Sequence, residues 1–275
     1  MDLRTALKQG AKLLEDGGIA SPRLTAEVLL VHATGKDRSY FLAHPESELT
    51  ELSWIHYGRY LHQRLKRMPT QYITKKQEFW GREFRVEPGV LIPRPETEHL
   101  IETVLAECPA AKRIVDVGVG SGAIAVTLAL ELNTAVVATD ISADALQIAR
   151  SNVEAYKAAV SLIHCDLASA IADQSMELLV SNPPYVPELD RSGIEPEVKD
   201  WEPMQALFAG ADGLAIYPRL FADARRILQP GGMFMAEIGI HQMEAVSIML
   251  AAGWAGVHFV NDLAGIPRLA VATRS

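Results

Sequence analysis

Four consecutive residues in the second half of the chain, Asn182-Pro183-Pro184-Tyr185, combine groups that could hold a planar amino group. The Asn side chain offers a carbonyl oxygen, and Pro183 offers a backbone carbonyl but has no N–H of its own. Because a residue before a proline is restricted to extended conformations, the two prolines make a stiff stem. Tyr185 would add a flat wall against a planar group. The stretch therefore predicts fixed hydrogen-bond acceptors beside an aromatic face.

A glycine-rich stretch, VDVGVGSGAIA at residues 115–125, indicates a nucleotide-type ligand. Gly118, Gly120 and Gly122 follow a predicted strand and open a predicted helix. Such glycines let the backbone approach a ligand closely, and the helix N-terminus supplies free N–H groups. The spacing also satisfies the looser dinucleotide-binding pattern, with Asp140 at the expected distance to hold a pair of ribose hydroxyls. The motif by itself predicts an adenosine cofactor without saying which one.

Polar side chains end three successive strands of the predicted sheet. Asp140 ends the second strand, Asp166 the third and Asn182 the fourth. Because ligands of doubly wound sheets bind at the carboxyl ends of the strands, we expect these side chains to line one crevice. A simpler role also stays open for the two acids, because Asp at a strand end often only caps the next helix.

The elements that must position these residues divide the chain into three parts. Apolar residues recur at helical spacing as far as about residue 68, which predicts a small helical bundle in residues 1–76. Residues 77–92 alternate around Gly81 and predict a β-hairpin connector. Strands and helices then alternate through residues 93–275, which predicts an α/β fold with a doubly wound, mostly parallel sheet.

Seven strands and four long helices are expected after residue 112. The predicted strands are 113–118, 135–140, 160–165, 176–181, 232–238, 256–260 and 268–273. The predicted helices are 121–132, 142–157, 214–228 and 241–252. The sequence QPGG at 229–232 predicts a turn between a helix and the fifth strand.

Composition places the chain among ordinary globular proteins, with 49% apolar and 22% charged residues. No apolar run approaches the roughly 18 residues that a membrane helix needs. The N-terminal stretch carries charges throughout, which is unlike a secretory signal. Two cysteines, Cys108 and Cys165, are too few for a disulfide framework or a four-cysteine metal site. We therefore expect a cytoplasmic protein without a metal.

Charge is unevenly distributed around the net value of −8. Residues 59–85 hold 8 basic groups against 2 acidic ones, whereas residues 86–275 hold 12 against 24. A polyanion would be repelled by the acidic part, so we expect no stable nucleic-acid binding. The basic segment, residues 59–85, predicts either a solvated helix face and hairpin or a docking surface for a partner.

Taken together, these residues resemble the class I S-adenosylmethionine-dependent methyltransferases. The resemblance is carried by an acid, Asp116, before the glycine turn, an acid ending the second strand, and Asn-Pro-Pro-Tyr ending the fourth. Within that class, Asn-Pro-Pro-Tyr is similar to the branch that methylates planar exocyclic or amide nitrogens.

Two longer stretches narrow the resemblance. VLIPRPETEHLIE at 90–102 and EPMQALFAGADGLAIYPRL at 202–220 resemble the release factor glutamine methyltransferase family. The helical N-terminal part, QYI at 71–73 and the EFWGREFRV hairpin also fit, so the resemblance covers essentially the whole chain. Departures from the family pattern are Val119, between the first two glycines, and the pair Thr74-Lys75.

The resemblance implies a reaction, a cofactor and a partner. A methyl group would pass from S-adenosyl-L-methionine to the side-chain amide nitrogen (N5) of the glutamine in the Gly-Gly-Gln loop of class 1 peptide chain release factors. The helical bundle and the basic segment would grip that protein. Asn182, Pro183 and Tyr185 are the implied catalytic residues, and Pro184 joins them in binding the substrate. The implied cofactor-binding residues are Gly118, Val119, Gly120, Ser121, Gly122, Asp140, Asp166, Leu167 and Asn182.

Three other functions remain open. The same Asn-Pro-Pro-Tyr can hold a flipped base, as in nucleic-acid adenine or cytosine amino-methyltransferases, although the acidic C-terminal part and the lack of a further target-recognition domain argue against that. A nicotinamide dehydrogenase would leave residues 182–185 without a role. A non-catalytic adaptor with a methyltransferase fold is disfavoured by the intact glycine turn, Asp140 and Asn182. Whether residues 186–202 form a lid also stays open.

Overall fold

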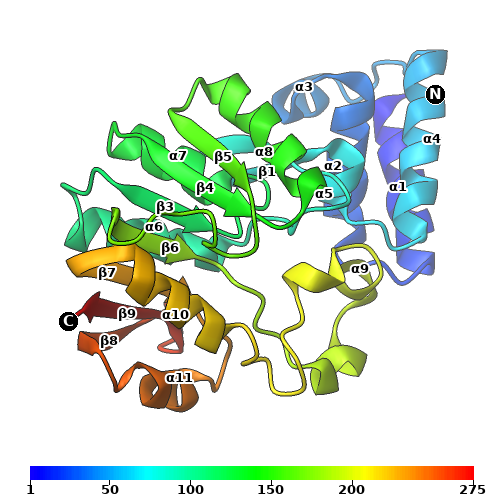
Figure 1. Ribbon diagram of the computed structural model, residues 1–275. Coiled ribbons are helices and arrows are strands. Elements are labelled where there is room, and N and C mark those ends of the chain that lie inside the picture. Colours follow the sequence, from blue (N-terminus) through cyan, green and yellow to red (C-terminus); the bar gives the residue numbers. More distant parts are fainter. The chain divides into compact units, whose positions relative to one another are not determined.

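The computed structural model describes all residues, 1–275, and the chain separates into two compact units (Figure 1). Unit 1 comprises Met1–Lys76 together with Glu195–Trp201. Unit 2 comprises Gln77–Ile194 and Glu202–Ser275, so the predicted hairpin lies within it. No sequence pattern indicated that the short segment Glu195–Trp201 would group with the N-terminal helices.

Unit 1 is a helical bundle, as its periodicity predicted. Its helices are α1 (Leu3–Asp16), α2 (Pro22–Thr34), α3 (Arg38–Ala43), α4 (Glu51–Leu65), α5 (Thr70–Thr74) and α9 (Pro196–Lys199). The side chain of Asp2 accepts a hydrogen bond from the Thr5 N–H and so caps α1, and Thr50 caps α4 in the same way. The apolar faces of these helices share one core that includes Leu14, Leu29, Leu30, Tyr57 and Leu61.

The segment that returns to unit 1 is held there by an ion pair of low exposure. Glu197 accepts hydrogen bonds from Arg64 Nη2 at 2.8 Å and from Arg67 Nη1 at 3.4 Å. The side chains of Arg64 and Glu197 are 8% and 15% exposed. Trp201 adds a hydrogen bond from its indole N–H to the carbonyl of Lys66 at 3.2 Å. Two arginines of the basic segment therefore serve the internal structure of unit 1.

Two more arginines of the basic segment are paired within unit 2. Arg82 forms an ion pair with Glu131 at 2.7 Å, and Arg85 pairs with Glu87. Both the helix and the hairpin of this segment thus use part of their positive charge internally.

Unit 2 is built on one seven-stranded sheet in the order β5-β4-β3-β6-β7-β9-β8. Neighbouring strands are parallel from β5 to β7, and β9 is antiparallel to both β7 and β8. This arrangement confirms the expected doubly wound, mostly parallel sheet. The strands are β3 (Ile114–Val117), β4 (Val136–Asp140), β5 (Val160–His164), β6 (Met176–Ser181), β7 (Leu228–Glu237), β8 (Trp254–Asn261) and β9 (Pro267–Arg274).

Helices cover both faces of the sheet (Figure 1). Successive residues of β6 point to opposite faces, as the pleat of a strand requires. Leu178 and Val180 pack with α6, α7 and α8, whereas Leu179 packs with α10 and α11. These helices are α6 (Glu98–Glu107), α7 (Ala123–Glu131), α8 (Ala143–Tyr156), α10 (Tyr217–Ile227) and α11 (Met243–Leu250). None of the helices combines the length and the apolar character needed to cross a membrane.

The connections of unit 2 include a hairpin and three 3-10 turns. The hairpin pairs β1 (Lys76–Phe79) with β2 (Arg82–Arg85) and is shorter than the 77–92 segment that alternation predicted. Trp80 and Gly81 both have positive φ values, 53° and 65°, as two-residue hairpin turns favour. The 3-10 turns are η1 (Pro95–Thr97), η2 (Glu188–Gly193) and η3 (Met204–Ala206).

The prediction of a turn at 229–232 is wrong. β7 begins at Leu228 and runs through these residues to Glu237. Its pairing with β6 shifts register between Met176 and Leu178, and Gly231 has a φ of +79°. Proline and glycine here mark an irregularity at the start of a strand, where a missing N–H and a positive φ are tolerated.

The ion pair that holds α9 leads to a test of unit 1. Burial acts to raise the pKa of Glu197, but the hydrogen bonds from Arg64 and Arg67, a backbone hydrogen bond and the charge of Arg64 outweigh it and lower the pKa. The stabilisation is therefore present above the ordinary pKa of Glu and is lost as the pH falls through the lowered value. Glu197→Ala should reduce the free energy of unfolding at pH 7 by about 2 to 3 kcal/mol, because Arg64 stays buried without its counter-charge.

Urea denaturation of this variant and of Glu195→Ala checks the prediction. Glu195 is exposed and only two residues away, so its replacement should change stability by less than about 0.5 kcal/mol. Equal urea midpoints for the two variants would contradict a stabilising role for the ion pair.

Candidate active site

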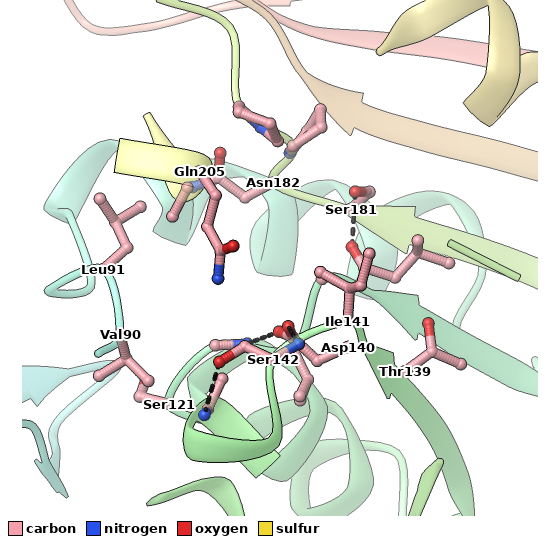
Figure 2. Close-up of a pocket in the computed structure, with 18 of the residues that line it drawn as sticks. Val90, Leu91, Ser121, Thr139, Asp140, Ile141, Ser142, Ser181, Asn182 and Gln205 are labelled. Atoms are coloured by element: carbon pink, nitrogen blue, oxygen red, sulfur yellow. Dashed lines mark hydrogen bonds between the residues drawn. The ribbon is translucent and has the colours of Figure 1, made fainter. Parts of the chain in front are cut away.

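A cavity of about 320 Å³ lies in unit 2, beyond the carboxyl ends of β3, β4 and β6 (Figure 2). The strand order changes direction between β3 and β6, because β4 and β5 lie on one side and β7 on the other. Ligands of open α/β sheets bind in the crevice at such a point. Among the residues singled out from the sequence, ten line this cavity: Gly118, Val119, Gly120, Ser121, Asp140, Asp166, Leu167, Asn182, Pro183 and Pro184. Gly122 and Tyr185 do not.

The glycine turn after β3 exposes backbone to the cavity. Gly118 and Gly120 have φ values of +83° and +51°, in the left-handed region that favours glycine. The N–H groups of Gly118 and Val119 both donate to the carbonyl of Thr139, each at 2.9 Å, which holds the turn against the end of β4. A Cβ at either glycine would meet nothing within 4 Å, so there is open space beside the backbone for a ligand.

Asp140 at the end of β4 links the turn to the next helix. Its Oδ2 accepts from the Gly120 N–H at 3.0 Å, and its Oδ1 accepts from the Ser142 N–H at 2.8 Å (Figure 2). A carboxylate oxygen has more than one acceptor position, so each still has capacity for a hydroxyl group. Asp140 is not the cap of α8, because the side chain of Ser142 caps this helix by accepting from the Ala145 N–H.

Asp166 and Leu167, in the segment after β5, also line the cavity. Asp166 forms an ion pair with Arg219, which also lines the cavity and which the sequence did not indicate. Leu167 has a φ of +46°, uncommon for a residue with a branched side chain. Such conformations concentrate at ligand sites, where the surrounding structure holds the strain.

Asn182 directly follows β6 and lies across the cavity from Ser121 (Figure 2). Its Nδ2 donates to Thr97 Oγ1 at 3.0 Å, and the Thr97 hydroxyl donates to Glu237 Oε2 at 2.7 Å. One Asn182 N–H is therefore already committed within the protein. No protein group donates to Asn182 Oδ1, so that oxygen is available to a substrate.

Tyr185 lies outside the cavity lining, in contrast to the flat wall expected from its position in the sequence. Its hydroxyl donates to Glu237 Oε1 at 3.0 Å. Burial, followed by the charge of Glu237, raises the pKa of Tyr185 well above its usual value, so the hydroxyl stays protonated as a donor. The structure thus gives Tyr185 an anchoring contact beneath the Asn-Pro-Pro-Tyr segment.

Glu237 and Thr97 are buried, and their part in the site was missed by sequence reasoning. Burial raises the pKa of Glu237, although the hydrogen bonds from Thr97 and Tyr185 and the charge of Arg268 act in the opposite direction. Glu237 ends β7, so the rule applied to Asp140, Asp166 and Asn182 would have found it. Gln205 on η3 also extends into the cavity, from a segment with no periodic pattern (Figure 2).

No group of three or more His, Cys, Asp or Glu side chains could hold a metal ion. Both cysteines are free thiols.

Comparison with known proteins identifies the chain's relatives. Residues 5–74 match the model of the PrmC N-terminal domain, and residues 95–194 match that of the methyltransferase small domain. The release factor glutamine methyltransferase of Koribacter versatilis is 44% identical over 275 residues, which cover 98% of each chain. That of Geobacter sulfurreducens is 39% identical over 269 residues, covering 97% of this chain and 95% of the relative. This chain belongs to the release factor glutamine methyltransferase family.

A solved structure shows a similar fold. The Thermus thermophilus 16S rRNA N2 G1207 methyltransferase, in complex with AdoMet and guanosine, matches 73% of this chain and 50% of its own length. The TM-score is 0.54 at 18% sequence identity, so this likeness concerns the fold alone.

As a member of this family, the chain is an S-adenosylmethionine-dependent methyltransferase. The residues present fit that cofactor. The cavity has the size of a small-molecule site, its floor is the open glycine turn, and Asp140 retains acceptor capacity suited to ribose hydroxyls. When bound, the cofactor supplies a methyl group on a positively charged sulfur.

Asp116 lies below the glycine turn and is fully buried. Neither carboxyl oxygen has a hydrogen-bond partner of normal geometry, and the nearby Ala125 N–H offsets only part of the burial effect. Burial, with a smaller contribution from the charge of Asp140, raises the pKa of Asp116 to about 7 from the usual 3.8.

The raised pKa predicts how stability changes with pH. At pH 8 the unfolded chain ionises Asp116 freely, whereas the folded chain must bury the charge. Asp116→Asn should therefore raise the free energy of unfolding at pH 8, by about 2 to 4 kcal/mol. Below pH 7 the folded protein takes up the proton, so the advantage should shrink and disappear near pH 4.

Urea denaturation across this pH range is the measurement. Asp190→Asn, at an exposed position of η2, is the control and should show no such pH dependence. If Asp116→Asn were less stable than wild type at pH 8, the buried carboxylate would be stabilising and the account of its charge would be wrong.

Proposed function

We propose that this chain transfers the methyl group of S-adenosylmethionine to the side-chain amide nitrogen (N5) of the glutamine in the Gly-Gly-Gln loop of class 1 peptide chain release factors. The observation that supports this most directly is the position of Asn182 at the cavity, with Oδ1 free of protein partners and Nδ2 held by Thr97. The names of the relatives agree with this substrate.

The site's own residues would act mainly by orientation and electrostatics. A carboxamide nitrogen is a poor nucleophile, because its lone pair is delocalised into the carbonyl group. Asn182 Oδ1 and the Pro183 carbonyl would accept hydrogen bonds from its two N–H groups and aim the nitrogen in line with the departing sulfur. Because the nitrogen becomes more positive in the transition state, these acceptors stabilise that state more than the ground state.

No strong general base is required by this scheme. Once methylated, the amide nitrogen carries an acidic proton that water removes readily. The site residues are thus assigned to binding and aiming: Asn182 and Pro183 hold the amide, and Pro184 lines the cavity beside them. The residues proposed to hold the cofactor are Gly118, Val119, Gly120, Ser121, Asp140, Asp166 and Leu167 along the lining, with Gly122 opening α7 behind them.

We assign the grip on the release factor to unit 1. Several of its apolar side chains are exposed, among them Leu24 on α2 and Leu52 and Ile55 on α4. Arg64, Arg67, Arg82 and Arg85 form ion pairs within the chain, which argues against the basic segment acting purely as a docking surface. The reaction would take place in the cytoplasm, which suits two free thiols.

The assignment of Asn182 can be tested by Asn182→Ala. This variant should lose at least about 100-fold in kcat, because an acceptor that is matched to the transition state is removed. Its Kd for S-adenosylmethionine, measured by calorimetry, should stay within about threefold of wild type, because the glycine turn and Asp140 are intact. Asn261→Ala, at an exposed position of β8, is the control. A parallel loss of cofactor affinity and rate would contradict a role in aiming the substrate.

The substrate is tested by labelling from S-adenosylmethionine carrying a tritiated methyl group. We expect label on a purified class 1 release factor, no label when its Gly-Gly-Gln glutamine is replaced by alanine, and a single methyl on that glutamine by mass spectrometry. Duplex and single-stranded DNA are supplied in parallel reactions. Label on DNA, or on the alanine-substituted factor, would overturn the proposed substrate.

A further inference from the structure

Hydrogen bonds connect the Asn182 side chain through Thr97 to the buried carboxylate of Glu237, which also accepts from Tyr185. Asn182 Nδ2 donates to Thr97 Oγ1 at 3.0 Å, and the Thr97 hydroxyl donates to Glu237 Oε2 at 2.7 Å. Tyr185 donates to the other oxygen, Oε1, at 3.0 Å. The participants come from η1, from the segment after β6 and from the end of β7, so only the folded sheet brings them together.

The donor and acceptor roles in this chain are set by its last member. In its ionised form, which the hydrogen bonds from Thr97 and Tyr185 and the charge of Arg268 stabilise, Glu237 can only accept. The Thr97 hydroxyl then donates its single proton to Glu237. The oxygen of Thr97 is then an acceptor toward Asn182. The amide end of the Asn182 side chain therefore faces Thr97, and the carbonyl end is left for the substrate.

This polarity matters because the two ends of an asparagine side chain have nearly the same shape. Packing alone does not distinguish Oδ1 from Nδ2, and hydrogen-bond partners decide which way the group turns. With Nδ2 toward the substrate, Asn182 would present a donor to an NH2 group that has only donors to offer. With Oδ1 toward the substrate, it presents the acceptor that the proposed reaction needs.

We propose that Glu237, acting through Thr97, is a positioning residue that holds the Asn182 side chain with its carbonyl oxygen toward the substrate's NH2 group. This inference rests on the proposed function and adds two residues to it. Neither has to touch the substrate for the effect.

The Asn-Pro-Pro-Tyr segment is also held at its Tyr185 end, by Glu237 through the hydroxyl and by Gln242 through the backbone. Gln242 Nε2 donates to the Tyr185 carbonyl at 2.9 Å, while Gln242 Oε1 accepts from the Gly239 N–H at 2.9 Å. A Cβ at Gly213 would lie 2.2 Å from the Tyr185 carbonyl oxygen, so backbone packs directly against the segment. The segment is thus fixed at both ends, and rotation of the Asn182 amide is the freedom that Thr97 and Glu237 remove.

Conservative substitutions separate polarity from packing. Thr97→Val keeps the branched shape and removes the hydroxyl, Thr97→Ser keeps the hydroxyl, and Glu237→Gln keeps the shape and adds a donor. Thr97→Val and Glu237→Gln should each lower kcat by about 10- to 100-fold, with KM for the release factor and Kd for S-adenosylmethionine within about threefold of wild type. Thr97→Ser should restore kcat to within about threefold of wild type. The double variant should be no slower than the slower single variant, because the two residues act in series.

The matched control is Thr103→Val. Thr103 is also a buried threonine, but its hydroxyl donates to the His99 carbonyl at 2.7 Å within α6, away from the cavity. Its loss should leave kcat unchanged, and thermal unfolding of all variants reports any general loss of structure.

The outcomes distinguish this inference from the proposed function. A wild-type protein that does not methylate the release factor glutamine would contradict the proposed function. An active wild type whose Thr97→Val and Glu237→Gln variants keep full kcat would overturn only the positioning role. So would a Thr97→Ser variant as slow as Thr97→Val, or equal losses of kcat and cofactor affinity.

Discussion

The parallel pairing of β3 with β6 is the constraint on which the rest of the site depends. The register sets Val117 opposite Ser181, and the Ser181 hydroxyl donates to the Val117 carbonyl at 2.7 Å. The next residue on each strand, Gly118 or Asn182, therefore leaves the sheet at the same level. One strand continues into the glycine turn and the other into Asn-Pro-Pro-Tyr, so a ligand on the first lies beside a group held by the second. A slip of one residue in this pairing would turn alternate side chains to the wrong face and separate the two halves of the site.

Polar groups in the apolar interior of unit 2 are arranged around that pairing. Asp116 lies one strand position below the turn with no hydrogen-bond partner, whereas Glu237 has a partner on each oxygen. The two carboxyl groups therefore affect their surroundings in different ways. An unpartnered buried carboxyl is costly to ionise, while a fully partnered one orders its neighbours and gives their hydrogen bonds a direction.

Local patterns predicted much of this arrangement from the sequence, and they did so where the signal lies within a few residues. The glycine turn, the strand-end Asp140 and the Asn-Pro-Pro-Tyr stem all fall at the cavity as expected, because each is a strand end followed by a distinctive turn. Thr97 was missed because its partners Asn182 and Glu237 lie 85 and 140 residues away in the chain, a separation that periodicity does not detect. The grouping of Glu195–Trp201 with unit 1 depends likewise on Arg64, 133 residues from Glu197. The turn predicted at 229–232 was wrong because glycine, as at Gly231 and Gly232, favours both turns and strand irregularities.

The central claim is that Asn182 presents its carbonyl oxygen, together with that of Pro183, to the amide nitrogen of a glutamine at the cavity. The most direct measurement is a crystal structure of the protein with S-adenosylhomocysteine and a peptide carrying the Gly-Gly-Gln sequence. We expect the glutamine nitrogen at hydrogen-bonding distance, about 3 Å, from both oxygens, with Asn182 Nδ2 still donating to Thr97. A glutamine bound elsewhere, or an Asn182 whose Nδ2 faces the peptide while Oδ1 faces Thr97, would contradict it.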